Sequence, residues 1–317
     1  MASQPSQLQT HELNGYVTEA EFPFVMRFAR WIGRQSWIPR GRDRILRLLF
    51  PPDNRPHFLF EVDFFTQKYR GDLAHFIDWM VFFYGSYAME ELSLLRACAE
   101  AIRSRKKGPV LFLDIGANVG HHSLYMAPFA DQVISFEPFP PLQAQIQEKM
   151  ALNNLANVTL VPFGLGDKDE VLDYHPGPEG NSGTGSFVSD DNGRNAPPVK
   201  LQIKRGDSVL EQLGVGKVDL IKIDVEGFEP AVLRGLAHRI QSDRPMIMME
   251  LNSFSRRQFG SEQGFRLVFY PGARFATVGG RSGRNYELRP FDYERTEEVL
   301  IVPSEMEWLS EALFKSN

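Results

Sequence analysis

The chain has 317 residues, of which 43% are hydrophobic, and a formal net charge of −5. This length predicts one large α/β domain with additions or two smaller domains, and the negative charge excludes a global field that attracts nucleic acid. One cysteine, Cys98, excludes an intramolecular disulfide framework, and no C-x-x-C or H-E-x-x-H signature of a zinc site occurs. The chain starts without a signal-peptide pattern and has no apolar run of the roughly 20 residues that span a bilayer, so we expect a cytoplasmic protein.

A basic amphipathic arm covers residues 22–50. Apolar residues recur at helical spacing from Phe24 to Ile32, and Arg27, Arg30 and Arg34 occupy the opposite positions. Such an arm usually packs on its own domain or on a partner subunit, which here would make a homodimer. Peripheral contact with an anionic membrane surface is the alternative.

Residues 57–105 complete a predicted N-terminal preface. Mixed alternation over residues 57–70 predicts a hairpin or an edge strand, residues 72–85 are rich in aromatic side chains, and Glu90 to Arg105 has helical spacing. Gly108 and Pro109 end that helix. We therefore divide the chain into an N-terminal arm and preface, residues 1–105, and a second domain, residues 106–317.

The second domain begins with a short apolar strand that runs into Asp114 and then into a glycine turn. An apolar run of this length suits a strand buried on both faces of a parallel sheet. Gly116 and Gly120 allow a sharp bend and a close ligand approach, and a helix starts near Ser123. This order of elements is typical of the cofactor-binding corner of an open α/β sheet.

The spacing of this turn indicates which cofactor it binds. A dinucleotide fingerprint requires three glycines, but here two glycines flank Ala117 and Asn118, and Asp114 would repel a phosphate. An acid there suits the positive charges of S-adenosylmethionine. Glu137, 23 residues after Asp114 and followed by Pro138, ends the second strand, where an acid takes ribose hydroxyls. A purely structural turn with surface acids is the alternative interpretation.

Two further segments accompany this corner. A third strand over residues 157–163 leads into Gly164 and Asp167, and we expect the adenine edge of the cofactor at these glycines. Residues 175–198 have turn chemistry throughout. They form either a plain loop or a lid over the active site.

A second group of acids ends two later strands. Asp224 and Glu226 follow an apolar strand that also holds Lys222, and Glu250 and Asn252 end the next strand. Open α/β sheets bind ligands at the carboxyl ends of their strands. A lysine in a central strand is costly unless it is paired, so we expect an ion pair between Lys222 and a carboxylate. Short strands near residues 274–278, 286–289 and 299–302 fit an antiparallel hairpin that closes the sheet.

These motifs together resemble the FkbM-type S-adenosylmethionine-dependent methyltransferases. The similarity covers residues 57–252 and rests on residues 113–120, the Glu137-Pro138 pair, Asp167 and residues 221–227. The resemblance implies a Rossmann-like, doubly wound α/β sheet of seven strands with one antiparallel strand. It also implies methyl transfer, mostly to hydroxyl oxygens of sugars, glycolipids or secondary metabolites.

The resemblance also implies roles for single residues. Asp114, Gly116, Asn118 and Gly120 would line the methionine half of the cofactor, and Glu137 would hold the ribose. The full predicted cofactor set is Asp114, Gly116, Ala117, Asn118, Gly120, Ser123, Glu137, Pro138, Gly164 and Asp167.

The predicted reaction is an in-line displacement that needs alignment and a base. The candidate bases are Asp224, Glu226, Glu250 and His122, since burial raises a carboxylate pKa and a histidine needs little tuning. Asp224, Glu250 and Asn252 could instead hold Mg²⁺ through their oxygens, but a metal-free site is the preferred interpretation.

Two other classes compete with this interpretation. A nicotinamide-dependent oxidoreductase uses a similar sheet, and the missing third glycine and Asp114 disfavour it. A non-catalytic methyltransferase-like binding protein would keep the fold, and the intact acids at three strand ends argue against it.

Overall fold

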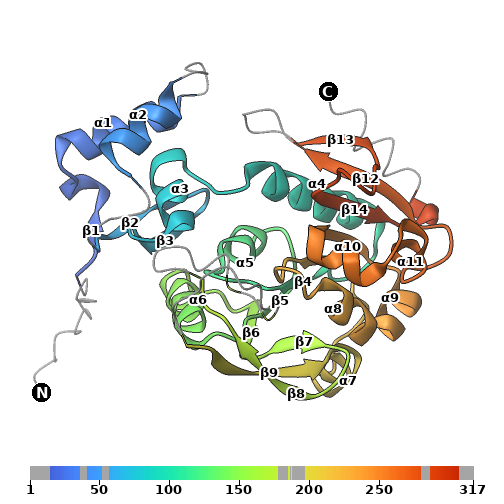
Figure 1. Cartoon of the computed structure of the whole chain (residues 1–317). Helices are drawn as coiled ribbons and strands as arrows, with labels where there is room; N and C mark the ends of the chain where they lie inside the picture. The colour runs from blue at the N-terminus through green and yellow to red at the C-terminus, as the bar shows by residue number, and fades with distance from the viewer. Residues whose placement is uncertain are drawn as a thin grey trace, which may run out of the picture.

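The computed structural model describes residues 15–35, 41–51, 57–177, 185, 187, 197–279 and 286–306. An eight-stranded sheet and two three-stranded sheets organise this part of the chain. Figure 1 shows the N-terminal helices and small sheet on one side, the C-terminal strands on the other, and the long helix α4 (Met89–Arg105) between them.

The N-terminal region is a small sheet covered by helices. Its elements are β1 (Val17–Thr18), η1 (Glu19–Glu21), α1 (Phe24–Gly33), α2 (Arg42–Leu49), β2 (Leu59–Phe64), β3 (Gln67–Asp72) and α3 (Phe76–Tyr84). β2 and β3 form the antiparallel hairpin that the alternation predicted. The buried Asp78 joins α3 to this hairpin, because its carboxylate accepts hydrogen bonds from Tyr69 Oη at 2.6 Å and from the Asp72 amide at 2.9 Å.

The central sheet has the strand order β13-β12-β14-β11-β10-β4-β5-β6. Its strands are β4 (Leu111–Ile115), β5 (Gln132–Phe136), β6 (Val158–Val161), β10 (Leu220–Ile223), β11 (Met246–Glu250), β12 (Arg274–Gly279), β13 (Glu287–Pro290) and β14 (Glu298–Val302). The five strands from β6 to β11 are parallel. Strand order reverses between β4 and β10, so ligands are expected at the carboxyl ends of these two strands.

Seven α-helices and one short 3-10 helix, η3 (Ser304–Met306), belong to the part of the chain after β4 that the structure describes. The α-helices are α5 (His121–Met126), α6 (Pro140–Leu152), α7 (Gly206–Gln212), α8 (Glu229–Gly235), α9 (Ala237–Asp243), α10 (Ser253–Phe259) and α11 (Glu262–Arg266). Helices between parallel strands give the doubly wound α/β fold that the sequence predicted.

The sheet has eight strands where the resemblance implied seven, and two strands, β14 and β13, run against the others where it implied one. The additional strand is β13, which forms a hairpin with β12 and pairs Thr277 with Arg289. The sheet ends at this edge with Pro290, which has no N–H to donate to a further strand.

A second small sheet has the strand order β7-β9-β8. Its residues were predicted from the sequence to form only a glycine turn and a single strand. It consists of β7 (Gly164–Gly166), β8 (Glu170–Tyr174) and β9 (Val199–Arg205). The predicted lid over residues 175–198 lies almost wholly outside the described residues, as does the last part of the chain after residue 306.

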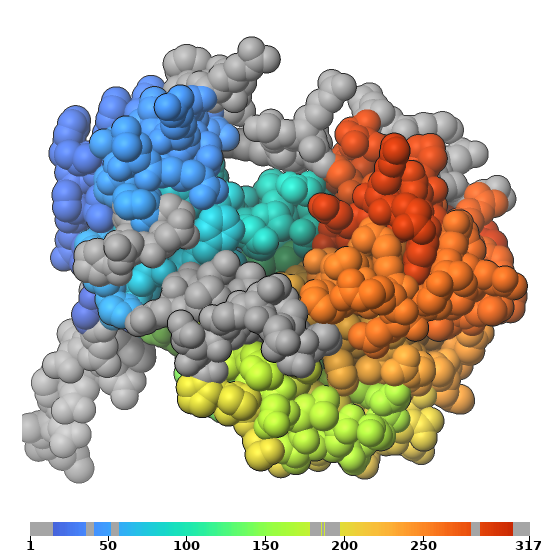
Figure 2. Space-filling view, in the orientation of Figure 1, coloured from blue at the N-terminus to red at the C-terminus, as the bar shows by residue number. Residues whose placement is uncertain are grey.

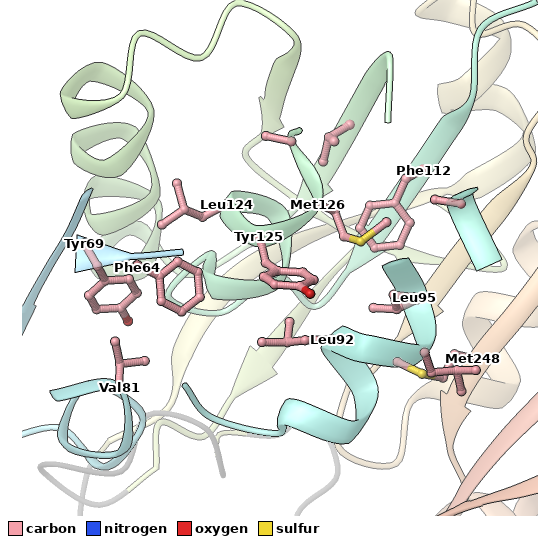
Figure 3. Packing of buried hydrophobic residues seen from close by; sticks show 14 of the residues in the cluster. Phe64, Tyr69, Val81, Leu92, Leu95, Phe112, Leu124, Tyr125, Met126 and Met248 are labelled. Atoms are coloured by element: carbon pink, nitrogen blue, oxygen red, sulfur yellow. The ribbon is translucent and has the colours of Figure 1, made fainter. Parts of the chain in front are cut away.

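Two apolar clusters cover the two faces of the central sheet. Along β4, Phe112 belongs to one cluster and Leu111, Leu113 and Ile115 to the other, as the period of a strand requires. The first cluster continues into the preface: Leu95 of α4 lies toward Phe112 and Met248, Leu92 lies below Tyr125, and Phe64 lies between Tyr69 and Tyr125 (Figure 3). The preface therefore packs directly on the sheet.

No helix in the described ranges is both long and apolar enough to cross a membrane.

Candidate cofactor and catalytic site

Asp114 is fully buried at the end of β4. Its Oδ2 accepts a hydrogen bond from Ser123 Oγ at 2.5 Å, and Ser123 Oγ lies 2.6 Å from Ser135 Oγ. Its other oxygen, Oδ1, has no hydrogen-bond partner within the described structure. Burial raises the pKa of Asp114, and the nearby Lys222 opposes that rise. The free oxygen gives the site one acceptor for a donor on a ligand.

The glycine turn follows directly and is closed by backbone hydrogen bonds. The amides of Gly116 and Ala117 both donate to the Phe136 carbonyl at 3.0 Å, which joins the ends of β4 and β5. Gly116, at φ 82°, is packed against the Asp224 carbonyl, so the end of β10 also meets this turn. Gly120 directly precedes α5, and the first three residues of that helix, 121–123, lie behind the turn.

Glu137 at the end of β5 is held by two backbone amides. Its carboxylate accepts from the Asn118 amide at 2.8 Å and from the Phe139 amide at 2.9 Å. Burial raises its pKa to about 8, although these hydrogen bonds lower it. Asn118 has φ 53°, and its side-chain Oδ1 is buried without a partner in the part of the chain that the structure describes.

A cavity of about 70 Å³ lies where the ends of β4, β5 and β10 meet. Its lining includes seven of the residues proposed above for the cofactor or the reaction: Gly116, Asn118, Glu137, Pro138, Gly164, Asp224 and Glu226. Phe187 forms another part of the wall, with its ring 5.2 Å from Tyr174 and 5.5 Å from Phe228. This volume is well below the about 300–1,000 Å³ of ligand pockets, so a nucleoside requires the cavity to widen.

Gly164 and Asp167 differ in their relation to this cavity. Gly164 lines the cavity. A Cβ at this position would lie 2.6 Å from Cδ1 of Ile203 on β9, so the glycine also makes room for the Ile203 side chain. Asp167 is not part of the lining. Its Oδ2 accepts from Arg234 Nε at 2.8 Å, which joins the end of β7 to α8.

Lys222 forms the expected ion pair in the centre of the sheet. It is buried on β10, in register with Asp114 on β4, and its Nζ donates to Asp224 Oδ2 at 2.9 Å. Burial alone would lower the pKa of Lys222, but Asp224, Asp114 and Glu91 together hold it above its ordinary value. Lys222 is therefore charged and lies next to the candidate catalytic residue Asp224.

The acids after β10 lie in a tight turn. The Asp224 side chain is 40% exposed, which leaves it accessible from the cavity that it lines. Glu226 adopts φ 52°, and the turn around it is closed by Glu229, whose Oε1 accepts from the Val225 and Gly227 amides at 3.2 and 3.1 Å.

Glu250 and Asn252 follow the neighbouring strand, β11. Burial, with Asp224 and Glu226 nearby, raises the pKa of Glu250 to about 8. Asn252 Nδ2 donates to Glu250 Oε2 at 3.0 Å, while Asn252 Oδ1 accepts from the first amides of α10. Among the described residues, no group of three or more His, Cys, Asp or Glu side chains is arranged to hold a metal ion.

His122 is buried on α5 beside a residue that the sequence did not single out. Its Nε2 lies 3.1 Å from Glu91 Oε2 on α4, without the alignment of a hydrogen bond. Burial and Lys222 lower the pKa of His122 well below its ordinary value. Burial raises the pKa of Glu91 to about 7, against the influence of Lys222.

Glu91, Tyr87 and Glu298 complete the acidic surroundings of Lys222. Glu298 on β14 pairs in register with Glu250, and burial raises its pKa well above the ordinary value. The only sequence signal for Glu91 and Tyr87 was that both lie within residues 57–252, the range that resembles the family. Nothing in the sequence places Glu298 opposite Glu250, because the pairing of β14 with β11 is non-local.

Comparisons with known proteins identify a family. Residues 114–290, more than half of the chain, match the family described as the methyltransferase FkbM domain. Methyltransferase 1 of Beauveria bassiana (strain ARSEF 2860) is 35% identical over 144 residues, which cover 39% of this chain and 57% of that protein. The hexuronic acid methyltransferase AglP of Haloferax volcanii is 28% identical over 131 residues, which cover 41% of this chain and 51% of that protein.

The chain thus spans about half the length of these curated relatives. Among solved structures, a methyltransferase FkbM from Methylobacillus flagellatus KT aligns with a TM-score of 0.42 and 14% identity, over 62% of this chain and 45% of that one. From the match over residues 114–290, the chain belongs to the FkbM methyltransferase domain family.

Proposed function

We propose that this protein is an S-adenosylmethionine-dependent methyltransferase that methylates a hydroxyl oxygen of a saccharide or another small molecule. The observation that carries this proposal is the cavity at the strand-order reversal, which places Glu137 and Asn118 on one side and Asp224 and Glu226 on the other. Binding groups and candidate catalytic acids thus share one cavity. Membership of the FkbM methyltransferase domain family supports the same reaction.

The residues around the cavity fit this cofactor chemically. Asn118 Oδ1, in the cavity lining, and Asp114 Oδ1, at the end of β4 and outside that lining, are buried acceptors without partners in the described structure, and they suit the ammonium group or hydroxyls of a ligand. Glu137 suits two ribose hydroxyls, and apolar side chains such as Phe136 and Phe228 suit a flat ring. When bound, S-adenosylmethionine supplies an electrophilic methyl group.

The protein's own acids then act on the acceptor hydroxyl. Asp224, held by Lys222, accepts a hydrogen bond from a second donor group of the acceptor and so orients the reacting hydroxyl. Glu250 takes the proton, because a pKa of about 8 makes a carboxylate a competent base near neutral pH. Glu226, which lines the cavity, and the neutral His122, which lies beside Glu91, are the other candidate bases. Mg²⁺ at Asp224, Glu250 and Asn252 remains the less favoured alternative, since the Asn252 side chain is already engaged by Glu250 and by α10.

The acceptor is proposed from the relatives. AglP carries the name of a hexuronic acid methyltransferase, which supports a saccharide hydroxyl as the acceptor here. In this proposal residues 1–105 contribute to acceptor binding and residues 106–317 hold the cofactor. A cytoplasmic location is proposed with it.

Calorimetric titration with S-adenosylhomocysteine, with NADH as the comparison ligand, tests the cofactor. We expect S-adenosylhomocysteine to bind and NADH not to bind. Binding of NADH without S-adenosylhomocysteine would contradict the proposal and favour an oxidoreductase. A screen of saccharide and secondary-metabolite hydroxyls with labelled cofactor would then test the acceptor.

The arm before Pro51 is proposed to contact an anionic membrane surface. Phe24, Phe28 and Trp31 on α1 are 80%, 51% and 51% exposed, and their rings form a stacked row with centroid spacings of 6.3 and 5.9 Å. Leu48 on α2 is 80% exposed as well. Arginines lie on the same two helices, and an aromatic row beside basic residues is complementary to the headgroup region of an anionic bilayer.

A further inference from the structure

A groove of about 700 Å³ lies between the N-terminal helices and the turn that joins α3 to α4. Arg34 and Arg42, at the end of α1 and the start of α2, line one part of it, and Tyr87 and Glu91 line another. Figure 2 shows the N-terminal region in blue and the C-terminal strands in red on either side of α4, in teal. The groove has about ten times the volume of the cofactor cavity and is large enough for a sugar-sized ligand.

The Tyr87 and Glu91 end of the groove reaches the candidate catalytic acids. Glu91 lies 3.1 Å from His122, and the Tyr87 ring packs edge-on against His121 at 5.5 Å. Burial raises the pKa of Tyr87 to about 12, and the charges of Glu91 and Asp224 add to this rise. Glu91 and Asp224 both act on the charge of Lys222, so this end of the groove is electrostatically linked to Asp224, which lines the cofactor cavity.

The other end of the groove holds a positive charge that nothing in the described structure neutralises. Arg34 lines the groove, but its Nε and Nη2 are buried without a hydrogen-bond partner. No carboxylate among the described residues forms an ion pair with it, and the neighbouring Arg30 has the same charge. Two buried guanidinium nitrogens without an acceptor are unfavourable, so this end of the groove favours an anion.

The other charged groups at this end do not compensate Arg34. Arg42 lies over the Tyr84 ring at 5.0 Å and donates to the Gln35 carbonyl at 2.7 Å. Asp43 is engaged, because its carboxylate accepts from Tyr84 Oη at 2.9 Å and from Arg47 Nε at 2.8 Å. Arg34 and Arg42 line the groove, and two of the acids that line it with them, Asp43 and Asp63, are already paired with Arg47 and Lys68.

We infer that the groove binds an anionic acceptor, whose carboxylate or phosphate is held by Arg34 and Arg42 while its hydroxyl lies near Tyr87, Glu91 and Asp224. The binding of an anion rests on the groove alone; its use as a methyl acceptor rests on the proposed function. Arginine suits both carboxylate and phosphate, because its planar N–H donors match two oxygens at once.

Titration of the full chain with glucuronate, glucose 6-phosphate, inorganic phosphate and glucose tests this inference. We expect glucuronate or glucose 6-phosphate to bind more tightly than neutral glucose, and the tighter of the two identifies carboxylate or phosphate as the preferred group. Arg34→Gln should weaken anion binding by about tenfold or more, since it removes a charge-assisted contact. Arg34→Lys keeps the charge and should lose less.

Arg27→Gln is the matched control, because it removes an equal charge from the exposed side of α1 and does not line the groove. Circular dichroism and S-adenosylhomocysteine titration of each variant establish that it is folded. Equal binding of glucose and both anionic sugars, no binding of either anion to the unaltered protein, or unchanged anion binding by folded Arg34→Gln would overturn the inference. Failure of S-adenosylhomocysteine to bind, with anion binding intact, would instead contradict only the proposed function.

Discussion

Replacement of Gly116 by alanine is expected to damage both stability and cofactor binding. Gly116 has φ +82°, where a left-handed alanine costs about 1–2 kcal/mol. The new Cβ would overlap the Asp224 carbonyl oxygen and lie 2.9 Å from the carbonyl carbon. These are backbone atoms at the end of a central strand, so relief requires β4 and β10 to separate, at a further about 1–3 kcal/mol. The total is about 2–5 kcal/mol of unfolding free energy.

Gly260→Ala is the matched control for this substitution. Gly260 has φ +74°, and a Cβ there would meet nothing within 4 Å. It should therefore show the cost of the left-handed conformation without the clash. The unfolding free energy of both variants is measured by urea titration, and cofactor affinity by S-adenosylhomocysteine calorimetry.

The clash predicts a second effect of Gly116→Ala. Displacement of the Asp224 backbone moves the wall of the cofactor cavity, so S-adenosylhomocysteine should bind about tenfold or more weakly, whereas Gly260→Ala should bind normally. If the two variants had equal unfolding free energies and equal affinities, the close approach of β4 and β10 at this turn would be refuted.

Three further predictions test the site and the arm. Asp224→Asn should reduce the rate of methyl transfer by about 100-fold. Asp173→Asn, which removes an exposed carboxylate paired with Lys200, should leave the rate unchanged. Near-normal turnover by Asp224→Asn would show that Asp224 has no part in the reaction. The pKa of Glu137 is raised from 4.5 to about 8 in the unliganded protein, so its protonated form stabilises the fold. That contribution is complete below pH 4.5 and is lost as pH rises through about 8. The unfolding free energy of the unaltered protein should therefore fall relative to that of Glu137→Gln over this range. A difference that does not change with pH would contradict the raised pKa. Phe28→Ser should weaken co-sedimentation of the protein with phosphatidylserine vesicles. Leu267→Ser, at a 73% exposed position on the α10–α11 side, should leave it unchanged. If the protein does not bind vesicles and sedimentation shows a Phe28-dependent dimer, the exposed face binds a second copy of the chain instead.

Much of the site can be predicted from local sequence patterns. Asp114, Glu137 and Asp224 each follow a short apolar run, and the carboxyl ends of parallel strands meet at one edge of a sheet. The position of Lys222 in an apolar central strand also predicted that it would need a carboxylate, and Asp224 supplies it at 2.9 Å. Period, turn chemistry and charge are properties of neighbouring residues, so a single sequence contains them.

Tertiary structure decided the features that depend on distant contacts. Glu91 joins the site from a helix far earlier in the chain, and Glu298 does so through the antiparallel pairing of β14 with β11. Asp167, expected near the adenine, pairs instead with Arg234. The eighth strand and the uncompensated charge of Arg34 likewise arise from packing between segments. Which acid is buried, and which partner it meets, is set by the summed packing of both sheet faces, and this energy is not contained in any local stretch of sequence.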